Sequence, residues 1–367
     1  MSPDEVSLGK AYVYDDCDIE GDCESIFDLA DHMLDRRPRL IDKLSLLWKL
    51  LRLPSGNRVE SGRTEARLIG SRHSLNRDRR AVTYHYDVSN DFFATYLDKN
   101  MVYSCGYFER EDDDLDTAQE RKLDYICRKL RLSSGERLLD IGCGWGGLII
   151  HAARKYGVKA LGITLSAPQA ELANERIERA GLGDRCRAEV RDYRMMNEPE
   201  SFDKLVSVGM FEHVGGSMLP GYFKQAYDLL KPGGVFHNHG IASSESYPVH
   251  KGRSFSDYFV FPDGELLPIN RTLAAAEHAG FEVRDVESLR EHYALTLRHW
   301  VSRLEANRER ALSFTDETTF RVWRLYMSGS AHGFHRGRLN VYQAVMVKSQ
   351  RSPSGLPLTR DDWYSKT

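Results

Sequence analysis

The sequence predicts an α/β fold in which a mostly parallel sheet carries helices on both faces. From about residue 130 onwards, short apolar runs alternate with amphipathic stretches, the pattern of repeated strand–helix–strand units. A glycine-rich turn, LLDIGCGWGG at 138–147, follows the first of these runs and is typical of a ligand-binding connection between a strand and a helix. The 367 residues are enough for one large domain and a smaller one.

The order of the apolar runs gives the expected order of the elements. We expect strands over 137–141, 158–164, 185–190, 203–209 and 233–241, and helices over 167–180 and 219–230. The segment 336–348 is expected to form a final antiparallel strand, followed by a polar tail over 350–367. In sheets of this type, ligands bind at the carboxyl ends of the strands.

The first eighty residues are strongly asymmetric in charge. Residues 1–35 hold eleven acidic residues and one basic residue, whereas residues 36–80 hold thirteen basic and four acidic residues. Within the basic segment, Trp48 and a set of leucines recur at helical spacing over 40–53. That pattern is typical of a helix at a membrane surface, although packing against the main domain would produce the same stripe.

Composition narrows the class of protein. A net charge of −3 gives no argument for nucleic-acid binding, and the six cysteines show neither a C-x-x-C pair nor zinc spacing. We therefore expect free thiols in a reducing compartment, and no metal site. No apolar signal segment opens the chain, and the stretch 40–53 is too charged to span a bilayer. The expectation is a cytoplasmic protein.

The glycine-rich turn fits two cofactors, and its neighbours distinguish them. Gly142, Gly144 and Gly147 fit a dinucleotide-binding turn, whereas Gly142, Gly144 and Gly146 after Asp140 fit a turn that binds S-adenosylmethionine. A dinucleotide site expects an acidic residue at the end of the second strand, but GITLSAPQ at 162–169 has none. The Asp140 carboxylate would also repel a diphosphate and attract a cofactor that carries an ammonium and a sulfonium. The sequence therefore favours S-adenosylmethionine.

Other polar residues near the strand ends are candidates for holding this cofactor. Thr164, Ser166 and Gln169 are expected to contact its ribose or methionine end, because no acidic residue is present there. Asp192 can accept a hydrogen bond from the adenine amine and Tyr193 can stack on the ring, although the two residues fit an ordinary surface position as well.

Several motifs in a fixed order resemble one known family. YHYDVSNDFFATYLDKNMVYSCGYF (84–108), LLDIGCGWGG, GITLS, FEHVG (211–215) and HYALTLRHW (292–300) resemble the cyclopropane-fatty-acyl-phospholipid synthases, which are related to the mycolic acid cyclopropane synthases. The resemblance implies a Rossmann-like class I methyltransferase fold over 131–349, with a cap at about 245–335 over an acyl tunnel. It further implies catalytic-domain helices over 63–130 and a small, mainly helical N-terminal domain over 1–62.

The resemblance also implies the activity and the site. The enzyme would transfer the methylene of S-adenosylmethionine to the cis double bond of an unsaturated acyl chain in membrane phospholipids, as a homodimer peripheral to the inner face of the membrane. A bound bicarbonate ion would be held by Cys105, Glu212, His239, Tyr293 and the backbone amide of Ile241. The implied cofactor-binding residues are Tyr103, Ser104, Asp140, Gly142, Gly144, Gly146, Thr164, Leu165, Ser166, Gln169, Asp192 and Tyr193.

The chemistry of such a reaction sets requirements on the site. An alkene is a poor nucleophile, and its methylation leaves a carbocation that needs a dry site lined by aromatic faces. Ring closure then requires a base that takes a proton from the new methyl group. The aromatic residues expected in the lining are Tyr84, Tyr86, Phe92, Phe93, Tyr103, Tyr107 and Phe108, although core packing would explain such a cluster equally well.

Several alternatives stay open on the sequence alone. Loss of a different proton would give a methylene- or methyl-branched chain in place of a ring. A methyltransferase for small amines and an inactive lipid-binding protein are further possibilities. His237 shares a strand face with His239, so either histidine fits the position assigned to His239.

Overall fold

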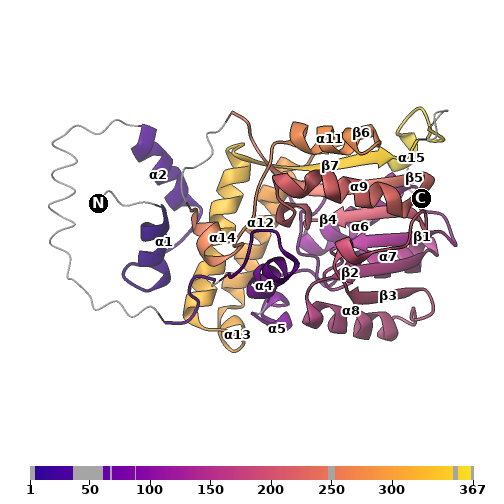
Figure 1. The fold of residues 1–367 in the computed structure, drawn as a ribbon. Helices are drawn as coiled ribbons and strands as arrows, with labels where there is room; N and C mark the ends of the chain where they lie inside the picture. The colour runs from indigo at the N-terminus through magenta and orange to yellow at the C-terminus, as the bar shows by residue number, and fades with distance from the viewer. Residues whose placement is uncertain are drawn as a thin grey trace.

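A seven-stranded sheet forms one half of the molecule (Figure 1). The computed structural model describes residues 5–35, 61–66, 68–86, 88–246, 253–349 and 354–364. The strand order is β3-β2-β1-β4-β5-β7-β6, with β1 to β5 parallel and β7 antiparallel to both of its neighbours. The strands are β1 (Arg137–Ile141), β2 (Lys159–Thr164), β3 (Cys186–Val190), β4 (Phe202–Val208), β5 (Leu230–Ser243), β6 (Glu282–Ser288) and β7 (Leu339–Val347). The expected α/β class and the six expected strands are confirmed.

Helices cover both faces of the sheet. Successive side chains of a strand point to opposite faces, and apolar side chains on both faces are buried under helices. On β1, Leu138 packs in the cluster under α6, α7 and α8, whereas Leu139 packs under α9 and α11 on the opposite face. The helices are α6 (Leu115–Leu130), α7 (Gly147–Tyr156), α8 (Ala167–Arg179), α9 (Leu219–Leu229) and α11 (Ile269–His278). Two of them, α8 and α9, confirm the expected helices.

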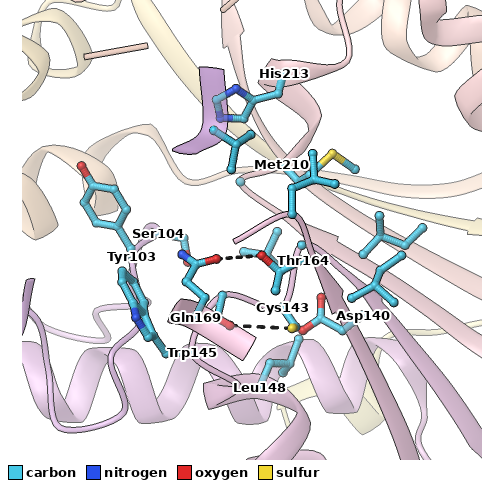
Figure 2. A pocket seen from close by; sticks show the side chains of 18 of the residues that line it. Tyr103, Ser104, Asp140, Cys143, Trp145, Leu148, Thr164, Gln169, Met210 and His213 are labelled. Carbon is cyan, nitrogen blue, oxygen red and sulfur yellow. Dashed lines mark hydrogen bonds between the residues drawn. The ribbon is translucent and has the colours of Figure 1, made fainter. Parts of the chain in front are cut away.

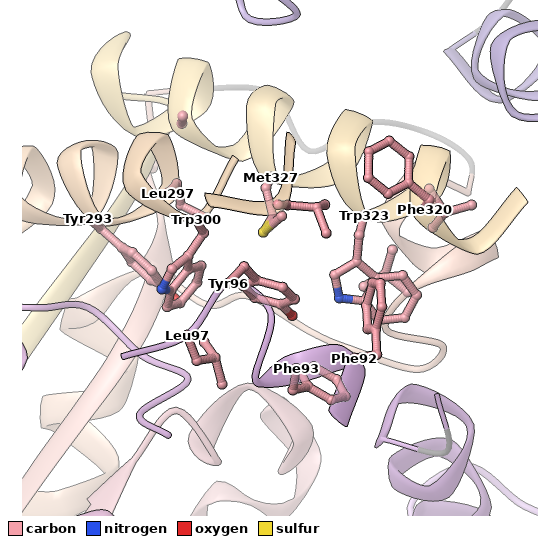
Figure 3. Close-up of a cluster of buried hydrophobic side chains, with 14 of the residues drawn as sticks. Phe92, Phe93, Tyr96, Leu97, Tyr293, Leu297, Trp300, Phe320, Trp323 and Met327 are labelled. Carbon is pink, nitrogen blue, oxygen red and sulfur yellow. The ribbon is translucent and has the colours of Figure 1, made fainter. Parts of the chain in front are cut away.

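The other half of the molecule is a helical cap, formed by α10, α12, α13 and α14, against which α4 and α5 pack (Figure 1). These helices enclose a cluster of buried aromatic side chains (Figure 3). On α14, Phe320, Trp323 and Met327 face this cluster because three- and four-residue steps lie on one side of a helix. The bounds are α4 (Leu75–Tyr86), α5 (Asn90–Phe93), α10 (Phe255–Phe259), α12 (Arg290–Ala306), α13 (Arg308–Leu312) and α14 (Glu317–His335). Single-turn helices η1 (Tyr193–Met195), η2 (Phe211–His213) and η3 (Gly216–Met218) follow β3 and β4.

The acidic N-terminal segment lies against the cap. Its helices α1 (Glu5–Val13) and α2 (Ser25–Asp35) lie beside α14 (Figure 1). Asp31 pairs with His332 at 2.8 Å, and Glu24 pairs with Arg298 at 2.8 Å. Carboxylates at the start of the chain therefore hold the N-terminal segment against polar side chains of the cap helices. The basic stripe over 40–53 lies outside the described residues.

Two expectations about the second half of the chain are wrong. The cap does not extend through the whole of 245–335, because α11 and β6 within it belong to the sheet layer. The sequence of β6, EVRDVES, is polar because the strand lies at the sheet edge and is only partly buried, so it lacks the apolar run of a central strand. The tail is not simply polar and loose, since α15 (Asp361–Tyr364) buries Trp363 against α6.

The structure also bears on the expectations of free thiols and of no membrane-spanning segment. All six cysteines are free, as their spacing predicted. Across the described ranges, no helix combines the length and the apolarity that crossing a bilayer requires.

Candidate active site

A pocket opens at the carboxyl ends of β1, β2 and β4, next to the turn that follows β3 (Figure 2). Ten of the twelve residues predicted to hold the cofactor line it: Tyr103, Ser104, Asp140, Gly142, Gly144, Thr164, Leu165, Gln169, Asp192 and Tyr193. The other two begin the adjacent helices. Gly146 is the N-cap of α7, and the Ser166 side chain caps α8 by accepting from the Gln169 amide.

The turn after β1 requires glycine at Gly142. This residue has φ +90°, and a Cβ there would lie 2.7 Å from Cβ of Met210. Its amide donates to the carbonyl of Ile163 at 2.9 Å, which ties the turn to the end of β2. Gly144 and Gly146 also have positive φ. The backbone therefore turns closely around the pocket and starts α7 with its free amides at the pocket edge.

Asp140 is the acidic group of this pocket. It is 2% exposed, and its Oδ1 has no hydrogen-bond partner among the described residues. Burial raises the pKa of Asp140 to about 7, and the charge of Lys122 lowers it only in part. A buried carboxylate with an unpaired oxygen is expensive unless a cation binds it. It suits a cofactor that carries an ammonium and a sulfonium.

Two other predicted polar groups are already engaged within the protein. The Thr164 hydroxyl donates to Oε1 of Gln169 at 2.8 Å, which orients the Gln169 amide in the pocket (Figure 2). Both carboxylate oxygens of Asp192 accept from the Arg194 guanidinium, at 2.9 and 2.6 Å. Asp192 therefore lines the pocket as half of an ion pair, and an adenine amine would share its oxygens with Arg194.

Glu212 lies in η2, directly after β4. Its Oε1 accepts from the backbone amide of Ile241 at 2.6 Å, while Oε2 is buried with no partner in the described part of the chain. Burial raises the pKa of Glu212 to about 7, and the hydrogen bond from Ile241 opposes this shift. Two members of the predicted anion site thus contact each other directly, and an anion would compete with Glu212 for the Ile241 amide.

His239 lies on β5 beside the end of β4. It pairs with Val208, the last residue of β4, and its carbonyl accepts from the Gly209 amide at 2.9 Å. His237 pairs with Val206, farther inside the sheet. His239 is therefore the histidine at the edge where ligands bind. Its Nε2 is buried and has no partner among the residues described.

Cys105 and Tyr293 approach the same region from the cap side. The Cys105 thiol lies 3.2 Å from the Gly106 carbonyl and 3.7 Å from that of Leu289, one turn before Tyr293 on α12. Burial raises the pKa of both the Cys105 thiol and the Tyr293 hydroxyl, so both groups keep their protons at neutral pH. The Tyr293 hydroxyl can donate a hydrogen bond to an anion, whereas the single thiol proton of Cys105, which is directed at these carbonyls, can do so only by turning away from them.

The aromatic cluster includes Cys105 and Tyr293 and reaches the cofactor pocket at Tyr86, Tyr103 and Trp145. Tyr86 contacts the Trp145 ring at 5.9 Å, and Tyr103 contacts Trp300 at 5.0 Å between ring centroids. Phe92 and Phe93 pack beside them (Figure 3). Tyr84 and Phe108, which the sequence also placed in this lining, are not members of the cluster.

The pocket also holds residues that the sequence did not single out. Among these are Lys122, Trp145, Met210 and His213. Lys122 is 1% exposed and donates to the Ser104 hydroxyl at 2.9 Å. Nothing in its local sequence distinguishes this lysine from a solvated residue of an amphipathic helix. Trp145 lies inside the glycine-rich turn, so its position in the motif was the available signal.

Comparison with known proteins decides the family. A profile of the mycolic acid cyclopropane synthetase family matches residues 73–344. The chain belongs to this family. A probable fatty acid methyltransferase of Pseudomonas putida is 46% identical over 80% of this chain and 75% of its own length. A second one, from Mycobacterium tuberculosis, is 36% identical over 97% of this chain and 86% of its own length.

Solved structures agree with this family. The cyclopropane synthase MmaA2 of Mycobacterium tuberculosis superposes with a TM-score of 0.70 at 33% identity, covering 74% of this chain and 98% of its own. The mycolic acid cyclopropane synthase CmaA1, solved with S-adenosylhomocysteine, gives 0.70 at 34% identity with the same coverage. The chain is therefore a methyltransferase of Rossmann-like class I fold that uses S-adenosylmethionine.

The pKa of Asp140 predicts how cofactor affinity varies with pH. The cationic cofactor favours the ionised carboxylate, so its binding releases a proton wherever Asp140 is protonated in the free enzyme. Affinity should therefore fall as pH falls below about 7, by up to about tenfold per pH unit. Calorimetric titration between about pH 6 and about pH 8 measures this dependence. An Asp140→Asn variant should bind weakly at every pH, and an unchanged slope in that variant would remove Asp140 from the cofactor site.

Proposed function

We propose that this methyltransferase modifies the cis double bond of an unsaturated acyl chain in membrane phospholipids and closes a cyclopropane ring there. One observation carries the proposal. Beside the cofactor pocket, the chain holds a buried acceptor, Oε2 of Glu212, and a buried ring nitrogen, Nε2 of His239, neither of which has a partner among the described residues. Unsatisfied buried polar groups are costly and are retained where a ligand satisfies them.

The cofactor residues are assigned by their chemistry. S-adenosylmethionine, when bound, supplies an electrophilic methyl group. Asp140 would neutralise its positive charge, and the turn from Gly142 to Gly146 would admit it close to the backbone. Tyr103 and Gln169 face the same pocket and would orient it. The surrounding aromatic faces of Tyr86, Trp145 and Trp300 would exclude water and stabilise positive charge on the acyl chain.

The residues around Glu212 would hold the base. A bicarbonate ion bound there would accept the proton that leaves the new methyl group. Glu212 would accept a hydrogen bond from it, and His239, Cys105 and Tyr293 would donate to it. The Ile241 amide would divide its hydrogen bond between this ion and Glu212. The protonated state of the thiol and the phenol at neutral pH supports their role as donors.

A second outcome of the same chemistry is a branched chain. Two relatives that cover most of this chain are described as probable fatty acid methyltransferases, a description that does not specify a ring. Loss of a proton from the acyl chain, in place of the new methyl group, would give a methyl-branched alkene. A 1,2-hydride shift that moves the cation to the methylated carbon, followed by loss of a proton from the new methyl group, would give a methylene branch. The presence of all five groups of the predicted anion site supports the ring as the first candidate.

The substrate class is tested with defined lipids. The protein is incubated with S-adenosylmethionine and vesicles of monounsaturated phospholipid, or of its saturated counterpart. The unsaturated chains should gain the mass of one methylene, and the saturated chains should not change. Transfer to small amines, or no transfer to any lipid, would contradict the proposal.

Membrane docking is part of this proposal, because the double bond lies deep in the bilayer. The basic segment 36–80 is the candidate for contact with anionic lipid, at roughly 1 kcal/mol per basic residue near the surface. Reversing the charges of Arg36, Arg37, Arg39 and Lys43 should weaken vesicle binding more than cofactor binding. Flotation of vesicles at rising salt measures how strongly the protein binds them, and vesicle binding that these substitutions leave unchanged would place the docking surface elsewhere.

We also propose that the protein is a homodimer, which is tested by sedimentation.

A further inference from the structure

A chain of buried polar groups connects His239 to the helix that covers its face of the sheet. On β7, Gln343 lies directly opposite His239, and Nε2 of Gln343 is 3.1 Å from Nδ1 of His239. On α6, Lys129 donates to Oε1 of Gln343 at 2.8 Å and also pairs with Glu287 of β6. Lys129, Gln343 and His239 are each at most 1% exposed.

The chemistry of these groups fixes the direction of each hydrogen bond. The Lys129 ammonium has only donors, so the oxygen of the Gln343 amide must face it. The amide nitrogen, which can only donate, must then face Nδ1 of His239. A ring nitrogen that accepts a hydrogen bond carries no proton, so the proton of neutral His239 lies on Nε2.

The environment keeps His239 neutral. Burial lowers the pKa of His239 well below its usual value, and the charges of Lys122 and Lys129 and the neighbouring His237 lower it further. No acidic group contacts its ring within the described residues. With Nδ1 occupied, Nε2–H is the one donor that the ring can offer to a ligand.

We propose that Lys129 and Gln343 are positioning residues that hold His239 in the Nε2–H tautomer, so that it presents a donor to the base site. The function of that donor rests on the proposed function, in which His239 binds an anion. The tautomer itself is a property of the resting protein. The opposite tautomer would direct a lone pair at the anion and weaken its binding.

The tautomer can be read directly by nuclear magnetic resonance. The protein is labelled with ¹⁵N-histidine, and long-range ¹H–¹⁵N correlations distinguish the protonated from the unprotonated ring nitrogen. The His239 signals are identified by their loss in a His239→Asn variant. We expect an unprotonated Nδ1 and a protonated Nε2 in the protein without ligand. A proton on Nδ1 would overturn the proposal without any variant being needed.

A Gln343→Glu variant should reverse the tautomer of His239, because the new carboxylate accepts a hydrogen bond from Nδ1, whereas the amide of Gln343 donates one to it. Nδ1 should then carry a proton, and turnover should fall about 10- to 100-fold, as for loss of a hydrogen bond to a charged group. Cofactor affinity should not change. The matched control is Gln225→Glu, since Gln225 lies on α9, on the opposite face, and donates to the Met196 carbonyl at 2.7 Å.

The remaining outcomes separate two claims. One is the relay, by which we mean the hydrogen-bonded chain from Lys129 through Gln343 to His239 that fixes the tautomer. The other is the proposed function. If Gln343→Glu does not fold, Lys129→Met tests the same relay, because a freed Gln343 amide should allow both tautomers. An unchanged tautomer in either folded variant would refute the relay. A reversed tautomer with normal turnover would keep the relay and refute the anion-binding role of His239 in the proposed function.

Discussion

Replacing Glu212 with Gln should lower turnover on the order of 10²–10³-fold, the usual cost of losing a preorganised hydrogen-bonding group at a catalytic site. The amide can still accept from Ile241, but it has no second carboxylate oxygen to offer to an anion. Cofactor affinity should remain unchanged, because the Glu212 carboxylate faces β5 and not the pocket turn. Single-turnover kinetics with monounsaturated phospholipid, together with calorimetric titration of the cofactor, measure the two quantities.

The pH dependence gives this prediction a second readout. Because the pKa of Glu212 is raised to about 7, the carboxylate is lost as pH falls through that value. At saturating S-adenosylmethionine, where the pH dependence of cofactor binding through Asp140 does not contribute, wild-type turnover should therefore fall below about pH 7, and this step should be missing in the variant. The control is Glu136→Gln, since Glu136 also accepts a backbone amide, that of Ser133 at 2.8 Å, but lies at the far end of β1. Wild-type turnover in Glu212→Gln would remove Glu212 from the mechanism.

Truncation of Trp323 to Ala should destabilise the protein by about 3–5 kcal/mol, the range for loss of a large buried aromatic side chain. Trp323 is fully buried on α14, beside Phe92 in the cluster (Figure 3). Its ring centroid lies 5.6 Å from those of His85 and Phe92. Arg63 lies over its ring at 4.6 Å. The variant leaves a cavity that these rigid rings cannot fill.

A Trp323→Phe variant is the matched control for this prediction. It keeps an aromatic ring and removes an indole N–H that has no partner among the described residues, so it should cost less than the Ala variant. Urea denaturation of both variants measures the free energy of unfolding. Equal losses in the two variants, or a loss below about 1 kcal/mol in Ala, would contradict the packing assigned to this cluster.

The elements that the sequence predicted well depend on local signals. The turn at 138–147 combines an apolar strand, an acidic residue and glycines within ten positions, which defines the local structure, and the cofactor followed from Asp140 together with the lack of an acidic residue over 162–169. The central strands are buried on both faces and therefore appear as continuous apolar runs. The helix that follows β2 was expected from the alternation of apolar runs and amphipathic stretches, and the structure shows that Ser166 caps it.

The features that the sequence did not predict depend on distant residues or on partial burial. Gln343 is separated by 104 residues from His239 and by 214 residues from Lys129, so no local pattern links the three. Edge strand β6 carries charged residues, and its sequence resembles a loop. The docking of α15 depends on Trp363, one aromatic residue within a polar tail.

Ring closure is tested most directly with S-adenosylmethionine that carries three deuterium atoms on its methyl group. The proposed mechanism removes one hydrogen from that methyl group, so the modified acyl chains should retain two deuterium atoms. They should also show cyclopropane resonances and no longer react as alkenes. Retention of all three deuterium atoms, or two in a product that still reacts as an alkene, would contradict ring closure and assign a branching reaction to this site.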